Sequence, residues 1–388
     1  MWRLGFTKGL KNDMKNFVLA TTTLVGAIVG LGIFGIPYTA ARAGFFIVVI
    51  YIVILGIVAL LIQLLYGEIV ERTEGKHRLT GYTEKYLGKG WKKVLGVSIV
   101  FGIYISLLAY IIVGGKFISL LLPDVLNPVV WGLVFWFVLS LAVLRGMKTV
   151  AWIELLMTGP LILFIFVIFI LGFGDISYTN LTSSNLKDIF LPYGVVLFAI
   201  FGSVAIPEVR EILKKDSVIY KRVIIVGSIV PVIIYILFTF LVVGISGPDT
   251  SQEALEGLVP YFGFVVMALG AAFGVFALST SYLILGLNLK HTFQYDWKMS
   301  KHIAGLLTIT VPAVLFIAGF QQFITIISIS GAVIGASIGI VILAIYRKVK
   351  KLGDKKPGYE LHVPSFIVYA LMILFALGGL YEIIYLLI

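Results

Sequence analysis

Apolar runs long enough to cross a membrane occupy most of this sequence and limit its fold more than any other feature. Each run is close to the ~20 residues that an α-helix needs to span ~30 Å of hydrocarbon. Because 60% of the residues are hydrophobic and only 13% are charged, we expect an all-α integral membrane protein in contact with the lipid bilayer. Eleven transmembrane helices are predicted, at residues 17–42, 44–68, 94–122, 128–144, 149–173, 189–212, 222–246, 258–286, 302–319, 323–346 and 364–388.

Basic residues between the runs predict how the chain is oriented. With the amino terminus in the cytoplasm, only Arg42, Lys116 and Lys187 of the 30 lysines and arginines fall outside the cytoplasmic segments. This distribution follows the positive-inside rule. We therefore expect a protein of the cytoplasmic (plasma) membrane, with its amino terminus cytoplasmic and its carboxyl terminus external. The same rule accounts for the net charge of +11, so we expect no nucleic-acid partner.

A repeat relates the two halves of the chain. The stretch GIFGIP at residues 32–37 corresponds to GSVAIP at residues 202–207, and the later runs keep nearly the same spacing. Five spans are an odd number, so the second half enters the membrane from the opposite side and the 5+5 repeat is inverted. Glycine and proline inside the first and sixth spans predict discontinuous helices 1 and 6. The predicted division is 1–173 for the first five-helix repeat, 174–346 for the second, 347–363 for a solvated cytoplasmic linker and 364–388 for one extra helix.

The residues around these two breaks carry a resemblance to known proteins. The stretch GAIVGLGIFGIPYTAARAG at 26–44, together with FGSVAIPEVREIL at 201–213, resembles the amino acid/auxin permease family of the amino acid-polyamine-organocation superfamily. The first span is also similar to that of the bacterial leucine transporter, whose Gly-x-x-Val-Gly-x-Gly run is matched by Gly26, Val29, Gly30 and Gly32. The resemblance implies a leucine-transporter-like fold and secondary transport of amino acids.

A broken helix offers backbone groups to a zwitterionic substrate. The N–H groups at the start of its second half are placed to bind a carboxylate, because a helix amino terminus carries partial positive charge. Freed carbonyls can accept hydrogen bonds from the substrate ammonium, and no charged side chain is required. The alternative is that the glycines only allow close helix packing. The predicted substrate-binding residues are Ala27, Ile28, Gly30, Leu31, Gly32, Tyr104, Ile200, Phe201, Gly202 and Ser203, with Phe198 and Tyr110 behind them.

The eighth span contains ALSTSY at residues 277–282, and this spacing resembles the sodium site of the superfamily. The resemblance implies that Na⁺ binds the carbonyls of Gly26, Val29 and Ala277 and the hydroxyls of Thr280 and Ser281. Neutral oxygens of this kind suit a weakly bound hard cation. The alternative is that the hydroxyls bond carbonyls of their own helix and only pack.

Two departures from the superfamily bear on ion coupling. The leucine transporter uses an asparagine for a second sodium site where this chain has Ile33, which argues against a second sodium ion. Proton-coupled relatives have a lysine in the fifth span, whereas the fifth span here contains Glu154 and no lysine. This difference argues against proton coupling.

Acidic residues near the spans are costly in lipid and often functional. Glu208 in the sixth span is a candidate for gating or proton relay, or for an ion pair with Arg210 or Arg222. Glu68 ends the second span, where gating and a salt bridge both fit its position. Glu382 in the last span lies outside the repeat, and we assign it no chemistry.

Together these features predict a secondary active transporter that imports a neutral L-amino acid by alternating access, coupled to sodium. A proton-coupled transporter of the same fold is the alternative. A channel or a membrane enzyme is disfavoured, because the sequence has no ring of pore-lining charges, no paired carboxylates and no HExxH or GxSxG motif. The chain has no cysteine, so disulfides and thiolate metal sites are excluded. We expect Na⁺ and no organic cofactor, and a monomer is compatible with this organisation.

Overall fold

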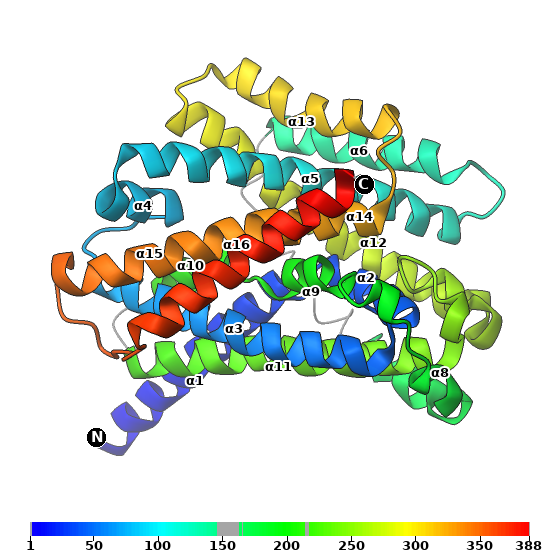
Figure 1. The fold of residues 1–388 in the computed structure, drawn as a ribbon, viewed down its shortest axis with the longest axis horizontal. Helices are drawn as coiled ribbons and strands as arrows, with labels where there is room; N and C mark the ends of the chain where they lie inside the picture. The colour runs from blue at the N-terminus through cyan, green and yellow to red at the C-terminus, as the bar shows by residue number, and fades with distance from the viewer. Residues whose placement is uncertain (1, 146–162, 165, 214–216, 388) are drawn as a thin grey trace.

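The computed structural model describes residues 2–145, 163–164, 166–213 and 217–387. Apart from one isolated bridge between Gly44 and Ser184, these residues form helices, turns and loops (Figure 1). The α-helices are α1 (Trp2–Ile28), α2 (Gly32–Ala43), α3 (Phe45–Arg72), α4 (Leu79–Leu87), α5 (Lys89–Leu121), α6 (Pro128–Arg145), α8 (Tyr178–Thr182), α9 (Pro192–Ile200), α10 (Ile206–Leu213), α11 (Ser217–Ser246), α12 (Val259–His291), α13 (Lys301–Ile317), α14 (Phe323–Ile329), α15 (Ala336–Leu352) and α16 (Ser365–Leu387). The short 3-10 turns are η1 (Phe173–Asp175), η2 (Leu186–Asp188), η3 (Ser203–Ala205), η4 (Gly247–Asp249) and η5 (Glu256–Leu258), and the π-helical turns are η6 (Thr292–Asp296) and η7 (Ser330–Gly335).

Most of the predicted spans are long apolar helices in the structure. Within the described residues, eight helices are long and apolar enough to cross a membrane, and the pair Met14–Ile28 and Gly32–Ala43, bent by 50°, adds a ninth. The span predicted at residues 302–319 corresponds to α13, which has only 17 residues. The fifth, 149–173 with Glu154, lies largely outside the described residues. The predicted all-α membrane fold class is confirmed, whereas the count of eleven spans and the domain boundaries stay predictions.

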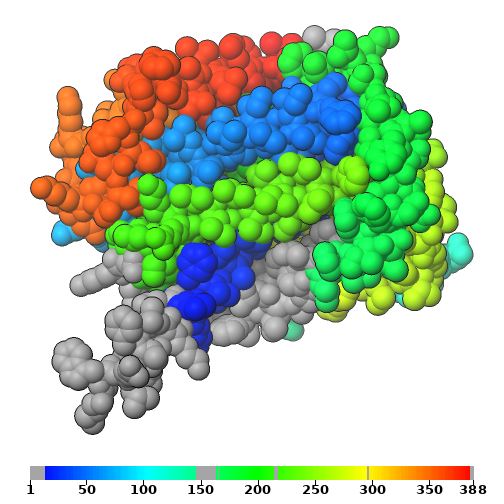
Figure 2. Space-filling view, turned by 90° about the horizontal axis from the view of Figure 1, so that it is seen from below, coloured from blue at the N-terminus to red at the C-terminus, as the bar shows by residue number. Residues whose placement is uncertain are grey.

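The two half helices α2 and α9 lie against each other in the middle of the molecule. Beside them, α3 packs against α11, and α11 packs against α1. Figure 2 shows this order on one face, where the helices run as neighbouring bands from α16 through α3 and α11 to α1. On the other side α5 packs against α6, α12, α13 and α14. The interrupted helices are therefore enclosed by continuous ones.

Glycines at the breaks have different roles. A Cβ atom at Gly32 would lie 2.5 Å from the Cβ of Ala199 on α9, and one at Gly202 would run into the side chain of Ile28. Both glycines therefore permit close packing, as the alternative in the sequence analysis anticipated. Gly30 differs, because no atom lies within 4 Å of the place its Cβ would take. Only Gly30 of these three faces open space.

The segment predicted as a solvated linker is partly helical and partly docked. α15 continues to Leu352, well beyond the apolar run. The following residues then turn back onto the end of α3, where the N–H groups of Asp354 and Lys355 donate to the carbonyl of Arg72 at 2.9 and 3.2 Å. We call residues 353–363 the docked segment. We also call the side of the molecule where this segment and loop 73–78 lie the basic side.

Candidate functional site

The first span is interrupted between Ile28 and Gly32. The N–H of Gly30 donates to the carbonyl of Ile28 at 2.9 Å, and the N–H of Ile33 donates to the carbonyl of Gly30 at 3.3 Å. These local bonds replace the helical ladder. Among the described residues, no backbone N–H donates to the carbonyls of Gly26, Ala27 or Val29, and the N–H groups of Leu31 and Gly32 have no backbone acceptor. The break therefore presents three free carbonyls and two free N–H groups, whereas the N–H of Gly30, which was also predicted to bind the carboxylate, is bonded within the break.

The sixth span is interrupted directly opposite. α9 ends at Ile200, and Phe201 is extended rather than helical, with φ −81° and ψ 90°. After Gly202 the chain makes the turn η3 and re-enters a helix at Ile206. The two predicted discontinuities are thus both present, and each occurs at the glycine-containing stretch that predicted it.

One side chain connects the two breaks. The hydroxyl of Tyr235 on α11 is buried and lies within hydrogen-bond distance of the carbonyl of Ile28, at 2.7 Å, and of the carbonyl of Ala199, at 2.9 Å. A phenol has a single proton, so it can donate to only one of these carbonyls at a time. Tyr235 therefore ties the end of α1 to the end of α9. Tyr235 is not among the residues predicted from the sequence.

A second polar side chain reaches the sixth span from α3. The amide nitrogen of Gln63 donates to the carbonyl of Ile200 at 3.5 Å, and the amide oxygen accepts a 2.6 Å bond from the hydroxyl of Ser228. Gln63 is 1% exposed. An amide in an otherwise apolar run is costly unless it is bonded. That cost is the signal in the sequence that could have identified Gln63.

A cavity of about 970 Å³ leads from the basic side to the second break. Its mouth is formed by loop 73–78 and the start of α5, with Lys76, Arg78 and Lys92 among its residues. Its deeper wall contains Ser106 from α5, Phe198 from the end of α9, and Phe201 and Ser203 from the break that follows, together with Ser330 and Gly331 of η7. The deeper wall carries no charged side chain, while the mouth is mostly basic.

The predicted substrate residues divide between this cavity and its surroundings. Phe201, Ser203 and Phe198 line it. Tyr104 does not line it, because its hydroxyl donates to the carbonyl of Leu307 on α13 at 3.1 Å. From α5 the cavity is lined instead by residues that include Gly102, Ile103 and Ser106. The other predicted residues, which form the two breaks outside the cavity lining, are Ala27, Ile28, Gly30, Leu31, Gly32, Ile200 and Gly202.

The residues predicted to bind sodium lie at the end of α1, in the break that follows it, and on α12. The hydroxyl of Thr280 donates to the carbonyl of Ala277 at 2.8 Å, so two predicted ligands bond each other in this arrangement. α12 packs against α5, α6 and α13, whereas α1 packs against α11 and α10. The free carbonyls of Gly26 and Val29 belong to the break in the first span. The sodium site therefore stays a prediction.

The two acids predicted near the gate have identified partners. Glu68 is fully buried, pairs with Arg72 at 2.8 Å and accepts the N–H of Leu361 at 2.8 Å. Glu208 lines the cavity, and its carboxylate lies 3.6 Å from Arg78. The partner of Glu208 is thus a residue of loop 73–78.

The side opposite the cavity mouth is covered by residues 250–258. Glu253 in this stretch is 2% exposed and pairs with Lys116 of α5 at 2.8 Å. The next residue, Ala254, is fully buried and has a positive φ of 66°, which costs energy for a residue with a Cβ. Burial raises the pKa of Glu253, while Lys116 acts in the opposite direction. The second break is therefore approached from the basic side, and residues 250–258 cover the other side.

Paired interruptions in the first and sixth spans, packed half against half, with a cavity that reaches the second of them from one side, are the features of a membrane transport protein. Comparison with known proteins places the chain more narrowly. Residues 14–382 match the tryptophan/tyrosine permease family, and the chain belongs to that family. This corrects the expected amino acid/auxin permease family. The motifs that suggested it contain the glycines and prolines of the two breaks, which report the shared fold more than the family.

Two individual relatives agree with this assignment, and one solved structure shows the same fold. The chain is 25% identical over 339 residues to the tyrosine-specific transport system 1 of Haemophilus influenzae, covering 82% of this chain and 84% of the relative. It is 26% identical over 249 residues to the tryptophan-specific transport protein of Pseudomonas aeruginosa, covering 61% of this chain and 58% of the relative. The crystal structure of MhsT in complex with L-phenylalanine has a TM-score of 0.67 and 14% identity, covering 95% of this chain and 97% of that one. The leucine-transporter-like fold is therefore confirmed.

Proposed function

We infer that this protein is a secondary active transporter that imports a neutral aromatic L-amino acid across the plasma membrane by alternating access. The observation that carries this conclusion is the pair of facing breaks beside a cavity whose deeper wall has aromatic and hydroxyl side chains and no charge. Such a wall favours an apolar side chain with a few polar contacts. The named specificities of the relatives, tyrosine and tryptophan, support the aromatic class.

The backbone groups of the first break suit the two charges of the substrate. The N–H groups of Leu31 and Gly32 begin α2 and can bind a carboxylate at its positive end. The carbonyl of Ala27 is free for the ammonium, whereas that of Ile28 is already bonded to Gly30 and Tyr235. The predicted role of Ile28 as an ammonium acceptor is therefore the weaker one.

For the driving ion we retain sodium, held by the carbonyls of Gly26, Val29 and Ala277 and the hydroxyls of Thr280 and Ser281. The free carbonyls in the first break support this proposal. The hydroxyl oxygen of Thr280 keeps lone pairs for a cation while its proton is donated to Ala277. Proton coupling is the alternative, and uptake measured with and without a sodium gradient distinguishes it from sodium coupling.

Uptake into proteoliposomes tests the function and the ion together. We expect saturable uptake of labelled tryptophan, tyrosine or phenylalanine, driven by an inward sodium gradient and absent with choline. Thr280→Ala should abolish the sodium dependence. Ser279→Ala is the matched control, because Ser279 is adjacent on α12 and its hydroxyl bonds the carbonyl of Val275.

The other outcomes discriminate between the alternatives. Uptake driven equally well by a pH gradient without sodium would replace sodium with protons. Uptake that never saturates would favour a channel. A clear preference for lysine or glutamate over aromatic amino acids would contradict the proposed substrate class.

A further inference from the structure

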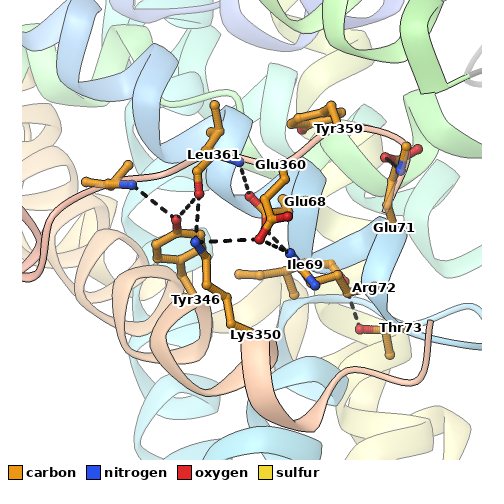
Figure 3. Close-up of polar contacts among 12 residues, drawn as sticks. Glu68, Ile69, Glu71, Arg72, Thr73, Tyr346, Lys350, Tyr359, Glu360 and Leu361 are labelled. Atoms are coloured by element: carbon orange, nitrogen blue, oxygen red, sulfur yellow. Dashed lines mark hydrogen bonds and ion pairs between the residues drawn. The ribbon is translucent and has the colours of Figure 1, made fainter. Parts of the chain in front are cut away.

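The docked segment is fastened to α3 by two buried carboxylates that bind its backbone (Figure 3). One oxygen of Glu68 accepts the N–H of Leu361 at 2.8 Å, and one oxygen of Glu71 accepts the N–H of Gly358 at 2.9 Å. The hydroxyl of Tyr359 adds a 2.7 Å bond to the carbonyl of Leu64. The segment is therefore a fixed part of the basic side.

The other oxygens of these carboxylates have different partners. Glu68 uses its second oxygen for Arg72, one turn further along α3, and Arg72 also pairs with Glu360 of the docked segment at 2.7 Å. Glu71 uses its second oxygen for Arg210, at 3.1 Å. Arg210 belongs to α10, so Glu71 joins three elements while Glu68 joins only two.

α10 is the half helix that the proposed transport cycle would move. It is connected to α9 through the break at Phe201 and Gly202, and its residue Glu208 lines the cavity. Glu71 is 3% exposed, and Arg210 is also largely buried. If α10 moves away from α3, Glu71 loses its cation, and separating a buried ion pair is strongly unfavourable. The Glu71–Arg210 pair therefore favours the arrangement seen here, in which the cavity opens to the basic side.

We propose that Glu71 is a positioning residue for transport, which holds α10 in the arrangement open to the basic side, and that the docked segment strengthens this hold by orienting the Glu71 carboxylate. The proposal rests on the proposed function, because it assumes that α10 changes position during the cycle. It assigns a role to a residue and a segment that act through α10 and make no contact with the substrate.

The absence of cysteine from the natural chain allows a clean test. Ser106→Cys places a single thiol in the cavity, and its labelling by a membrane-impermeant maleimide added from the basic side reports how often the cavity is open there. Inside-out vesicles expose that side under the predicted orientation. In this background Glu71→Gln should slow labelling by about threefold or more. Glu71→Asp, which keeps the charge, should restore part of the rate.

Two further variants separate this role from general damage. Glu211→Gln is the matched control, because Glu211 also lies on α10 but pairs with Lys76 and Arg78 at an exposed site, where an ion pair contributes little. It should leave the labelling rate nearly unchanged. Tyr359→Phe loosens the docked segment without changing any charge, and it should slow labelling in the same direction as Glu71→Gln but by less.

The proposal is overturned if folded Glu71→Gln labels as fast as the parent or faster, or if Glu211→Gln has an equal effect. If Glu71→Gln does not fold, an unchanged rate in Tyr359→Phe has the same consequence. The labelling rate needs no substrate. Absence of amino acid uptake together with the expected labelling shift would therefore reject the proposed function and leave the role of Glu71 standing.

Discussion

The hydroxyl of Tyr235 lies 2.7 Å from the carbonyl oxygen of Ile28, the last helical residue before the first break. The same hydroxyl lies 2.9 Å from the carbonyl of Ala199, near the end of α9. Both residues are buried, so their carbonyls depend on hydrogen bonds made within the protein. One continuous helix, α11, thus holds both interruptions in place through a single oxygen atom.

Replacing this tyrosine tests how much the breaks depend on it. Tyr235→Phe keeps the ring and leaves the two carbonyls without the phenol, so we expect a loss of about 1–3 kcal/mol in stability. The measurement is the thermal unfolding temperature in detergent. Tyr282→Phe is the control, because its buried hydroxyl pairs with Ser140 at 3.3 Å, away from the breaks. If Tyr235→Phe lost as much stability as Tyr282→Phe or less, the role assigned to Tyr235 would be contradicted.

The glycines of the first break give a matched pair of substitutions. Gly32→Ala places a methyl group 2.5 Å from the Cβ of Ala199 and should destabilise the protein by about 1–3 kcal/mol through overpacking. Gly30→Ala meets no atom within 4 Å, so it should unfold at nearly the parent temperature while raising the KM for uptake. Equal unfolding temperatures for the two variants would show that the packing of α2 on α9 is looser than described.

Gln63 and Ser228 should behave as one unit. Replacing Ser228 leaves the buried amide oxygen of Gln63 without its donor, whereas the double variant removes that oxygen as well. We expect Gln63→Leu and Ser228→Ala each to lower the unfolding temperature, and the double variant to lose about 0.5–3 kcal/mol less than the sum. Strict additivity would mean that their 2.6 Å bond contributes nothing to stability.

The cover formed by residues 250–258 should depend on pH. Burial raises the pKa of Glu253 above its ordinary value of 4.5. Glu253 therefore holds its carboxyl proton more tightly in the packed cover than it would when exposed to water. The stability that protonated Glu253 contributes to the cover is fully present below the ordinary pKa. It is lost as the pH rises through the raised pKa. A thiol introduced as Leu255→Cys, buried at present, should therefore be labelled faster at higher pH.

Two controls make this result specific. The rate must be corrected for thiolate formation with an exposed thiol such as Lys187→Cys. Glu253→Gln should remove the remaining pH dependence, because it has no proton to release. A corrected rate that falls with pH would reverse the assigned sign and contradict the prediction.

The sequence predicted the fold and the breaks well, and the cavity wall less well, for a physical reason. Glycine and proline act on the local backbone, so Gly30 and Pro37 signal a break wherever the helix lies. Which face of α5 meets the cavity depends on the rotation of that helix. α5 is apolar nearly all round, so nothing local distinguishes Tyr104, which bonds Leu307, from Ser106, which lines the cavity. The docking of residues 353–363 could not be predicted, because Glu68 and Glu71 accept hydrogen bonds from backbone N–H groups of this segment. Nearly every residue has a backbone N–H, so these bonds leave no mark in the sequence.

The π-helical turn η7 affects whether the tenth span can accept the deletion of a residue. Such a turn holds one more residue than regular α-helical winding, and each residue of an α-helix turns the chain by about 100°. Deleting one position within Ser330–Gly335 would let the turn relax to regular winding. α15 would then keep the face that it presents to α3, because the π turn absorbs the extra residue, and only the part of the cavity wall that η7 supplies would change. The tenth span can therefore lose one residue at η7 without rotating the rest of the helix, which a regular helical turn would not allow.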